Sequence, residues 1–116
     1  MKISLSLPWP PSANQYYRRA RNVTYLSEQG KRFKQQVAEI VAEHGQKLSG
    51  RLSVYITLAA PTKRKYDIDN RIKATLDALQ DAGVFDDDEQ VDFIQVNRLK
   101  PYRGGGCKVH VFGDKP

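Results

Sequence analysis

Apolar and polar residues alternate in two stretches of the chain, and each stretch predicts a strand with one buried face. In the first, Ile3, Leu5 and Leu7 are separated by serines. Residues 52–58 repeat this pattern with Leu, Val, Ile and Leu at every second position. A period of two puts all of these side chains on one face of an extended chain. Prolines at positions 8, 10 and 11 end the first strand, because proline cannot donate a hydrogen bond to a neighbouring strand.

A helical spacing of apolar residues after Ser27 predicts a long amphipathic helix. Ser27 suits the N-cap position, where a hydroxyl accepts a hydrogen bond from the first turn. Glycines at positions 45 and 50 mark where this region closes. The apolar stripe can pack on a sheet or contribute to an interface between two chains, and the pattern alone does not decide. Its members are Phe33, Val37, Ile40, Val41, His44 and Leu48.

A second, shorter helix is predicted around residues 70–82. Asp69 or Asn70 can serve as its N-cap, and Gly83 stands just past its end. The apolar face of this helix consists of Ile72, Leu76 and Leu79, and the opposite stripe consists of Asp69, Lys73 and Asp77.

Three further strands complete the predicted fold. A short one is expected at residues 23–26, and two more at residues 91–99 and 107–112, joined by a hairpin turn at residues 101–106. The main elements follow the order β-α-β-α-β-β, which favours an α+β fold in which a small mixed sheet carries two helices packed on it. With 116 residues, 40% of them hydrophobic, the chain has room for a single domain spanning residues 1–116.

Charge is strongly segregated along the chain, whose net charge is +6. Residues 67–92 hold nine of the thirteen carboxylates and only two basic residues, whereas residues 1–66 hold twelve basic and three acidic residues. A protein that places divalent cations against the phosphates of a polyanion needs such a distribution. Carboxylates bind the metal, and Lys and Arg hold the phosphate backbone.

Cys107 is the only cysteine, so no intrachain disulfide can form and a reducing cytoplasm is the expected location. We expect its thiol to pack as a small apolar group in a strand. No stretch approaches the roughly 18 apolar residues that span a membrane, and no membrane partner is expected. The first residues resemble the start of a signal peptide, but prolines interrupt them too early, which favours a strand.

Asp67 and Asp69 lie where a basic loop enters the second predicted helix, and their short spacing lets both carboxylates reach one ion. If the chain returns along the sheet, Asp88 closes the site from the other side. Three hard oxygen ligands suit Mg²⁺, with Mn²⁺ as a substitute. Zinc is disfavoured because His44 and His110 lie far from this segment in the sequence.

Lys73 follows Asp69 by one helical turn, and two interpretations remain open. Its ammonium group can offset repulsion between carboxylates or contact a scissile phosphate. Alternatively, Asp69 and Lys73 form an ordinary surface pair that contributes only a few tenths of a kcal/mol. The Asp-Asp-Asp-Glu sequence at residues 86–89, taken alone, is typical of a solvated turn.

Three stretches interleave aromatic and basic residues, a composition typical of surfaces that track phosphates and stack on exposed bases. The first belongs to an expected exposed loop at residues 12–21, the second precedes Asp67, and the third lies before Cys107. Their members are Tyr16, Tyr17, Arg18, Arg19 and Arg21; Lys63, Arg64, Lys65 and Tyr66; and Lys100, Tyr102 and Arg103.

Several motifs in this order and spacing resemble the RusA family of Holliday junction resolvases. The match runs from Ile3 to beyond Val91 and so covers most of the chain. The motifs are Leu-Pro-Trp-Pro-Pro-Ser at 7–12, Asn14, Tyr-Tyr-Arg at 16–18, Asp-Ile-Asp-Asn at 67–70, Lys73, Asp-Ala-Leu at 77–79, Ala-Gly at 82–83, Asp-Asp at 87–88 and Gln-Val at 90–91.

The resemblance implies a homodimer that binds four-way DNA junctions and makes paired symmetric nicks with Mg²⁺. It implies that Asp67, Asp69 and Asp88 are the catalytic metal ligands and that Lys73 supports them, with Asp87 as a candidate helper. A twofold dimer also suits the approximate twofold symmetry of a junction. The stretches at 16–21 and 63–65 are the expected DNA-binding residues. One position departs from the relatives, which carry a basic residue where this chain has Tyr66, and this puts the preferred cutting sequence in doubt.

Two alternatives stay open at this stage. One is a related metal-dependent nuclease that acts on forks, flaps or duplex DNA, and comparing cleavage of a junction with cleavage of linear duplex separates it. The other is a non-catalytic DNA-binding protein whose acidic cluster is solvated or binds metal only for stability. In that case Mg²⁺ would raise the melting temperature without producing nicked DNA.

Overall fold

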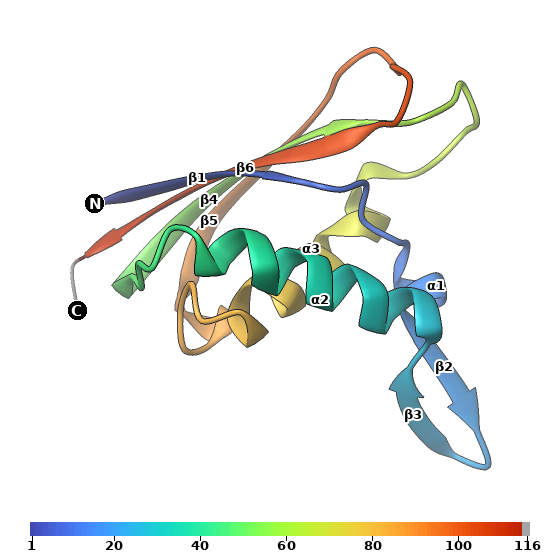
Figure 1. The fold of residues 1–116 in the computed structure, drawn as a ribbon, viewed down its shortest axis with the longest axis horizontal. Coiled ribbons are helices and arrows are strands. Elements are labelled where there is room, and N and C mark those ends of the chain that lie inside the picture. Colours follow the sequence, from blue (N-terminus) through green and yellow to red (C-terminus); the bar gives the residue numbers. More distant parts are fainter. Residues whose placement is uncertain (115–116) are drawn as a thin grey trace.

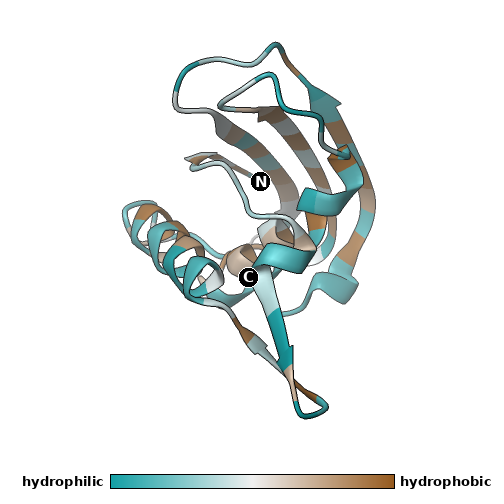
Figure 2. Cartoon of the chain, turned by 90° about the vertical axis from the view of Figure 1, so that its right-hand side faces the viewer, coloured by the Kyte–Doolittle hydropathy of each residue, from teal (hydrophilic) through white to brown (hydrophobic). Residues whose placement is uncertain are grey.

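The computed structural model describes residues 1–114, and its centre is a four-stranded sheet (Figure 1). The strands β1 (Lys2–Leu7), β6 (Gly106–Asp114), β4 (Ser49–Ala59) and β5 (Val91–Arg98) are neighbours in this order. The pairs β1–β6 and β6–β4 are antiparallel, and β4–β5 is parallel. The prediction of a mixed sheet is therefore confirmed, as is the alternation of hydrophobic and hydrophilic positions along its strands (Figure 2).

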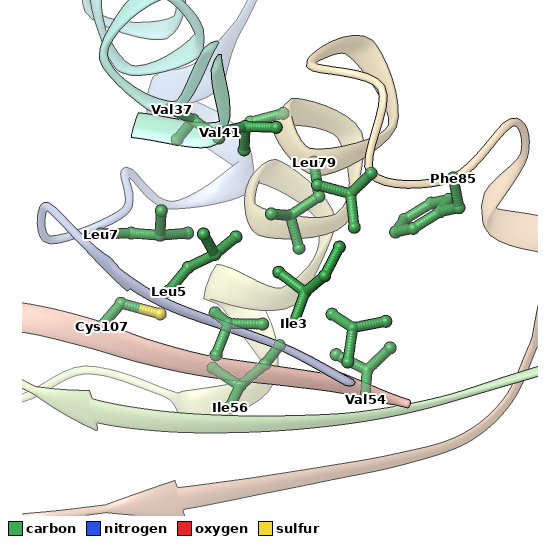
Figure 3. Packing of buried hydrophobic residues seen from close by; sticks show 14 of the residues in the cluster. Ile3, Leu5, Leu7, Val37, Val41, Val54, Ile56, Leu79, Phe85 and Cys107 are labelled. Atoms are coloured by element: carbon green, nitrogen blue, oxygen red, sulfur yellow. The ribbon is translucent and has the colours of Figure 1, made fainter. Parts of the chain in front are cut away.

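Two helices, α2 (Glu28–Ala42) and α3 (Ile72–Asp81), pack on the same side of this sheet. Figure 3 shows Val37 of α2 and Leu79 of α3 pointing toward Leu5 and Ile56 of the strands. All four side chains are at most 4% exposed. The apolar stripe of α2 thus faces the sheet, which decides between the two alternatives that the sequence left open.

The long predicted helix is shorter than expected. It ends at Ala42, with Glu43 as its C-cap, so His44 lies outside it and is exposed. Gly45 has a φ of 61°, a left-handed conformation that does not continue an α-helix. Leu48 is still buried because the chain turns back, and its N–H donates to the carbonyl oxygen of Val84 at 2.8 Å.

The second helix also begins differently. The short 3-10 helix η1 (Ile68–Arg71) precedes α3, and Arg71 occupies the N-cap position of α3 without a side-chain capping bond. The prediction that Asp69 or Asn70 caps this helix is wrong, because the 3-10 turn takes up both residues. Past the end of α3, Gly83 has a φ of 91°, as expected for a helix stop. The fully buried face of α3 consists of Ala74, Thr75, Ala78 and Leu79. Of the predicted apolar face, Leu79 is buried, whereas Ile72 and Leu76 are only partly buried.

Residues 12–21 are ordered elements instead of the expected exposed loop. They form the short helix α1 (Ala13–Tyr16) and the strand β2 (Tyr17–Ala20), which pairs with β3 (Val23–Leu26). This hairpin points away from the rest of the molecule (Figure 1). The expectation of exposure is wrong for Tyr16, which is 0% exposed. A side chain without exposed surface is not available for stacking on a DNA base.

The start of α2 is docked tightly on α1. Ser27 is the N-cap, as predicted, and its hydroxyl accepts a hydrogen bond from the N–H of Gly30 at 2.9 Å. The same hydroxyl donates to the carbonyl oxygens of Gln15 and Tyr16. A side chain on Gly30 would clash with the Tyr16 carbonyl oxygen, so the close approach of the two helices requires glycine at this position.

Strands β5 and β6 do not form the predicted hairpin, because β4 lies between them. The connecting residues 99–105 instead lie against the end of β4. The N–H of Tyr102 donates to the carbonyl oxygen of Ala60 at 3.0 Å. Cys107 is 2% exposed in β6, as predicted, and burial raises the pKa of its thiol to about 12. Within residues 1–114, no helix combines the length and apolar character needed to cross a bilayer.

Candidate functional site

Many acidic residues of the 67–92 segment have basic partners on the surface. Arg51 of β4 is bound to Asp92 at 2.6 Å and to Glu89 at 3.3 Å, and its hydrogen bond holds the pKa of the Asp92 carboxyl below its usual range. Lys47 forms an ion pair with Asp86. These exposed pairs join β4 and the segment before it to residues 86–92. These three acids therefore already serve surface contacts between β4, the segment before it and the 86–92 turn.

A second group of charges joins α2 to α3. Lys34 lies 3.3 Å from Asp81 and 4.0 Å from Asp77. The hydroxyl of Tyr16 donates a hydrogen bond to Asp77 at 2.5 Å. Burial and the nearby Asp77 charge raise the pKa of Tyr16, so its hydroxyl stays protonated and Asp77 is the acceptor.

Asp67 and Asp69 differ from these acids. In the described residues 1–114, neither carboxylate takes part in a side-chain hydrogen bond or an ion pair. Asp67 is the extended residue before η1, and Asp69 lies in its first turn. Both side chains are exposed. Two unpaired carboxylates at one turn repel each other, and a cation relieves that repulsion.

Two arginines anchor the segment around Asp67 to other parts of the fold. Arg98, at the end of β5, donates to the carbonyl oxygen of Tyr66 at 2.9 Å, and its guanidinium lies 4.4 Å from the centre of the Tyr66 ring. Arg71 donates to the carbonyl oxygen of Pro10 at 2.7 Å. Burial lowers the pKa of Arg71. The turn that carries Asp67 is therefore anchored to both the end of β5 and the proline segment after β1.

Asp88 is brought to α3 by two contacts. Its N–H donates to the side-chain oxygen of Gln80 at 2.8 Å, and its carboxylate lies 3.7 Å from the ammonium of Lys73. The surface pair between Lys73 and Asp69 considered above is absent from the described ion pairs, and Lys73 pairs with Asp88 instead. Lys73 lies at the start of α3, which continues directly from η1. Its ion pair therefore connects η2 (Asp88–Gln90) with the part of the chain that carries Asp69.

The carboxylates of Asp67, Asp69 and Asp88 offer the hard oxygen donors that a divalent cation prefers. Within the described residues, those of Asp67 and Asp69 have no side-chain partner. Within residues 1–114, however, no three Asp, Glu, His or Cys side chains are gathered closely enough to hold one ion. The hypothesis that Asp67, Asp69 and Asp88 share a metal ion therefore stays a prediction. Asp87 has a structural task in the described fold, because its carboxylate caps η2 by accepting a hydrogen bond from the N–H of Glu89 at 2.9 Å.

Comparison with known proteins identifies the family. The family model described as endodeoxyribonuclease RusA matches residues 8–112. The chain belongs to this family. It is 38% identical over 110 residues to the crossover junction endodeoxyribonuclease RusA of Escherichia coli strain K12, covering 93% of this chain and 92% of the relative. The protein of the same name from Enterobacteria phage 82 is 37% identical over 109 residues, covering 92% and 91%. That of Enterobacteria phage HK97 is 37% identical over 107 residues, covering 90% and 89%.

The basic residues proposed for DNA contact in this RusA-family chain are exposed in two places. Arg18, Arg19 and Arg21 lie on the β2–β3 hairpin, and residues 63–65 lie in the loop before Asp67. A concavity of about 620 Å³ separates the hairpin from the start of α2, and its lining includes Arg18, Lys31 and Arg32. Sequence reasoning missed the two α2 residues, because a basic residue on a helix surface has no distinguishing local pattern.

Tyr17 lies in the electrostatic field of the site. The pKa of the Tyr17 hydroxyl is raised, mainly by burial and next by the negative charge of Asp77. The positive charge of Lys73 lowers this pKa, and the negative charge of Asp88 raises it. Its ring packs edge-on against Tyr16, with centroids 4.8 Å apart. Tyr17 is the first residue of β2, so it joins the basic hairpin to Tyr16, which is bound to Asp77 of α3.

Four further residues shape the site without having been predicted. Three of them contact partners that are distant in the sequence, and the fourth, Gln80, accepts a hydrogen bond from the N–H of Asp88 across the turn after α3, so no periodic local signal marks them. The one sequence feature that points to this region is the single tryptophan, Trp9, which lies between prolines and whose ring contacts the ring of Tyr66. The four residues are Lys34, Gln80, Arg71 and Arg98.

Proposed function

We propose that this protein is a metal-dependent, structure-specific endodeoxyribonuclease that resolves four-way DNA junctions by paired symmetric nicks. The observation that carries the proposal is that Asp67 and Asp69, at the turn preceding the Lys73–Asp88 ion pair, have no side-chain partner within the part of the chain that the structure describes. Every other acid from 77 to 92 has a basic partner or a capping role. Relatives named crossover junction endodeoxyribonucleases match over nearly the whole chain.

Asp67, Asp69 and Asp88 are the residues that would hold the cation, and Mg²⁺ fits their oxygen donors, with Mn²⁺ as a substitute. When bound, a divalent cation lowers the pKa of a coordinated water and stabilises the negative charge that develops on the phosphate. Asp87 assists indirectly, because its capping bond fixes the η2 turn that carries Asp88.

Lys73 positions Asp88 and balances its charge in the DNA-free protein. Its side chain is 57% exposed, so the ammonium group is accessible to a phosphate that approaches the carboxylates. A cation at this point stabilises the extra negative charge of the transition state of phosphodiester hydrolysis. Tyr17, at the same site, is available to contact the neighbouring sugar-phosphate backbone.

The β2–β3 hairpin and the 63–65 loop would hold the DNA backbone. The hairpin that carries Arg18, Arg19 and Arg21 extends away from the body of the protein (Figure 1). Such contacts position the substrate and make binding strongly dependent on salt.

We further propose that the active form is a homodimer in the cytoplasm. A junction has two strands to cut that are related by approximate twofold symmetry, and a C2 dimer supplies one catalytic site for each. The single cysteine, Cys107, is a buried free thiol, which is compatible with a reducing compartment. Light scattering coupled to size exclusion would give twice the 13.2 kDa chain mass for a dimer, and the mass of one chain would contradict it.

The deciding experiment uses a labelled synthetic four-way junction with Asp67→Asn, Asp69→Asn and Asp88→Asn variants. Each is expected to lose Mg²⁺-dependent cleavage while binding the junction as well as or better than the parent, because a repulsion between carboxylate and phosphate is removed. Asp86→Asn is the matched control, since Asp86 is engaged with Lys47, and it should cleave normally. Full activity in all three site variants would overturn the assignment. Equal cleavage of linear duplex would contradict junction specificity alone.

A further inference from the structure

A small cavity opens beside the turn that carries Asp67. Its volume is about 250 Å³, below the 300–1,000 Å³ typical of drug-sized ligands. Its wall comes from four separate parts of the chain: the proline segment after β1, helix α1, the start of α2, and the loop before η1. The lining residues that matter for the argument are Trp9, Gln15, Gln29, Lys65, Tyr66 and Arg71. One of them, Tyr66, is the immediate neighbour of Asp67 in the chain.

The wall combines two aromatic rings with cationic groups. Trp9 and Tyr66 meet edge to face, with centroids 5.0 Å apart, and the guanidinium of Arg71 lies 4.9 Å from the Trp9 ring centre. Arg64, Lys65 and Arg71 are the charged groups of the lining, which contains no carboxylate. Two exposed glutamines add amide groups: Gln29, and Gln15, whose oxygen already accepts a hydrogen bond from the N–H of Ser12 at 3.1 Å and whose NH₂ group can donate. Rings for stacking, amides for base edges and cations for phosphate are together the chemistry of nucleotide recognition.

Two polar atoms in this wall lack a partner. Within the described residues, the Tyr66 hydroxyl and the Nε of Arg71 are the buried side-chain atoms without a hydrogen bond. Native proteins leave few such groups unsatisfied, and each calls for a missing partner. Arg71 donates through another nitrogen to the carbonyl oxygen of Pro10, so its Nε is the donor left over. Both unsatisfied atoms belong to residues that line the cavity.

We propose that this cavity binds one unpaired base of the DNA strand that is cut, next to the scissile phosphate. The proposal rests on the nuclease function proposed above and specifies how that site would recognise its substrate. Because the Trp9 and Tyr66 rings are at 88° to each other, the base would stack on one of them and meet the edge of the other. Its own edge would meet the amide of Gln15 or Gln29 and, after a side-chain movement that uncovers them, the two unpartnered atoms. Arg71 and Lys65 would hold the attached phosphate.

This arrangement gives the enzyme a reason to prefer a branch point. A base within a continuous duplex is stacked on both sides, and unstacking it costs free energy, whereas a base that is already unpaired or at a distortion is moved more easily. A cavity of base size adjacent to Asp67 would therefore be filled more readily at a junction crossover than in linear DNA. Contact with phosphates alone would not discriminate between the two.

The test measures binding in the absence of divalent metal, so that cleavage does not interfere. Four-way junctions are prepared in which each nucleotide near the crossover is replaced, one at a time, by an abasic analogue. For the parent protein, removal of one particular base is expected to weaken binding about tenfold, as for the loss of a stacked base. For Tyr66→Ala and Gln29→Ala, that same base should matter less than about threefold, because part of its contacts is already gone.

Gln46→Ala is the matched control for Gln29→Ala, since Gln46 is an exposed glutamine outside the cavity lining, and it should keep the full tenfold effect. Tyr66→Phe serves if Tyr66→Ala is poorly folded, because it removes only the hydroxyl. The proposal is wrong if no abasic position stands out, or if the variants weaken binding equally at every position, which would indicate phosphate contact alone. Either result leaves junction cleavage by the parent protein intact, so it is distinguishable from failure of the nuclease assignment itself.

Discussion

The hydroxyl of Tyr16 donates a 2.5 Å hydrogen bond to Oδ2 of Asp77, across 61 residues of sequence. Tyr16 is the last residue of α1 and leads directly into the basic β2–β3 hairpin. Asp77 lies one helical turn after Lys73 on α3. This partly buried contact therefore links the arginine-bearing hairpin to the helix that carries Lys73.

Tyr16→Phe removes this hydrogen bond while keeping the buried ring. Because the acceptor is a carboxylate and the site is partly buried, we expect the free energy of unfolding to fall by about 2 kcal/mol. Urea denaturation at constant pH measures the change. Tyr25→Phe is the matched control, since Tyr25 is 50% exposed, and it should leave the denaturation midpoint unchanged. An equal midpoint for Tyr16→Phe and the parent would show that the contact contributes nothing to stability.

Lys73→Gln should slow the single-turnover cleavage of a four-way junction by about a hundredfold or more, the usual cost of losing a group that stabilises transition-state charge. Stability should change by less than about 1 kcal/mol, because the ion pair with Asp88 is partly exposed and 3.7 Å long. Lys47→Gln removes another partly exposed lysine, whose ion pair is with Asp86, and should cleave at the parent rate. An unchanged rate for Lys73→Gln would reduce the lysine to a surface-pair role.

Arg19→Gln tests the hairpin as a phosphate-binding element. If Arg19 neutralises one phosphate, the slope of log binding constant against log salt concentration should become shallower by about one unit. The measurement is a salt titration of junction binding by fluorescence anisotropy. Lys2→Gln is the control, because β1 begins at the side of the molecule away from the hairpin (Figure 1). Identical slopes for Arg19→Gln and Lys2→Gln would remove the hairpin from the DNA interface.

The buried thiol of Cys107 should make the protein less stable in alkali. Burial raises its pKa from 9.0 to about 12, opposed by a smaller effect of a Thr75 hydrogen bond. The native state therefore holds this proton more tightly than the unfolded state. The resulting contribution of the protonated thiol to the free energy of unfolding is complete below about pH 9. It is lost between about pH 9 and 12, at about 1.4 kcal/mol per pH unit.

Urea denaturation at several pH values, compared between the parent and Cys107→Ala, isolates this contribution from that of other groups. The difference in unfolding free energy between the two proteins should narrow or reverse as the pH rises past 9. A difference that stays constant to pH 11 would show that the thiol titrates alike in both states.

Local patterns identified those parts of the structure that depend on near neighbours. The alternation around Ile3 and Val54 predicted buried strands, Ser27 predicted the start of α2, and Gly83 marked the end of α3. These features could be read because the two-residue and 3.6-residue periods, capping and chain reversal involve residues only a few positions apart. The spacing of Asp67 and Asp69 at a turn was visible for the same reason.

Pairing between distant segments could not be read in this way. The hairpin expected between the last two strands was wrong because β4 inserts between them. Tyr16 looked like an exposed aromatic residue beside arginines, yet its ring is buried and its hydroxyl meets Asp77. Strand order and burial are set by which apolar faces pack together, and that choice depends on the whole chain.

The sequence by itself determined the main strands and the two long helices, the family resemblance and the concentration of carboxylates between residues 67 and 92. Only the tertiary structure decided which of those carboxylates have partners. Arg51 and Lys34, far away in the chain, engage Glu89, Asp92, Asp77 and Asp81. Among residues 1–114, no side chain pairs with Asp67 or Asp69. An ion pair requires two groups within about 4 Å in space, and only folding brings residues this distant in sequence to that separation.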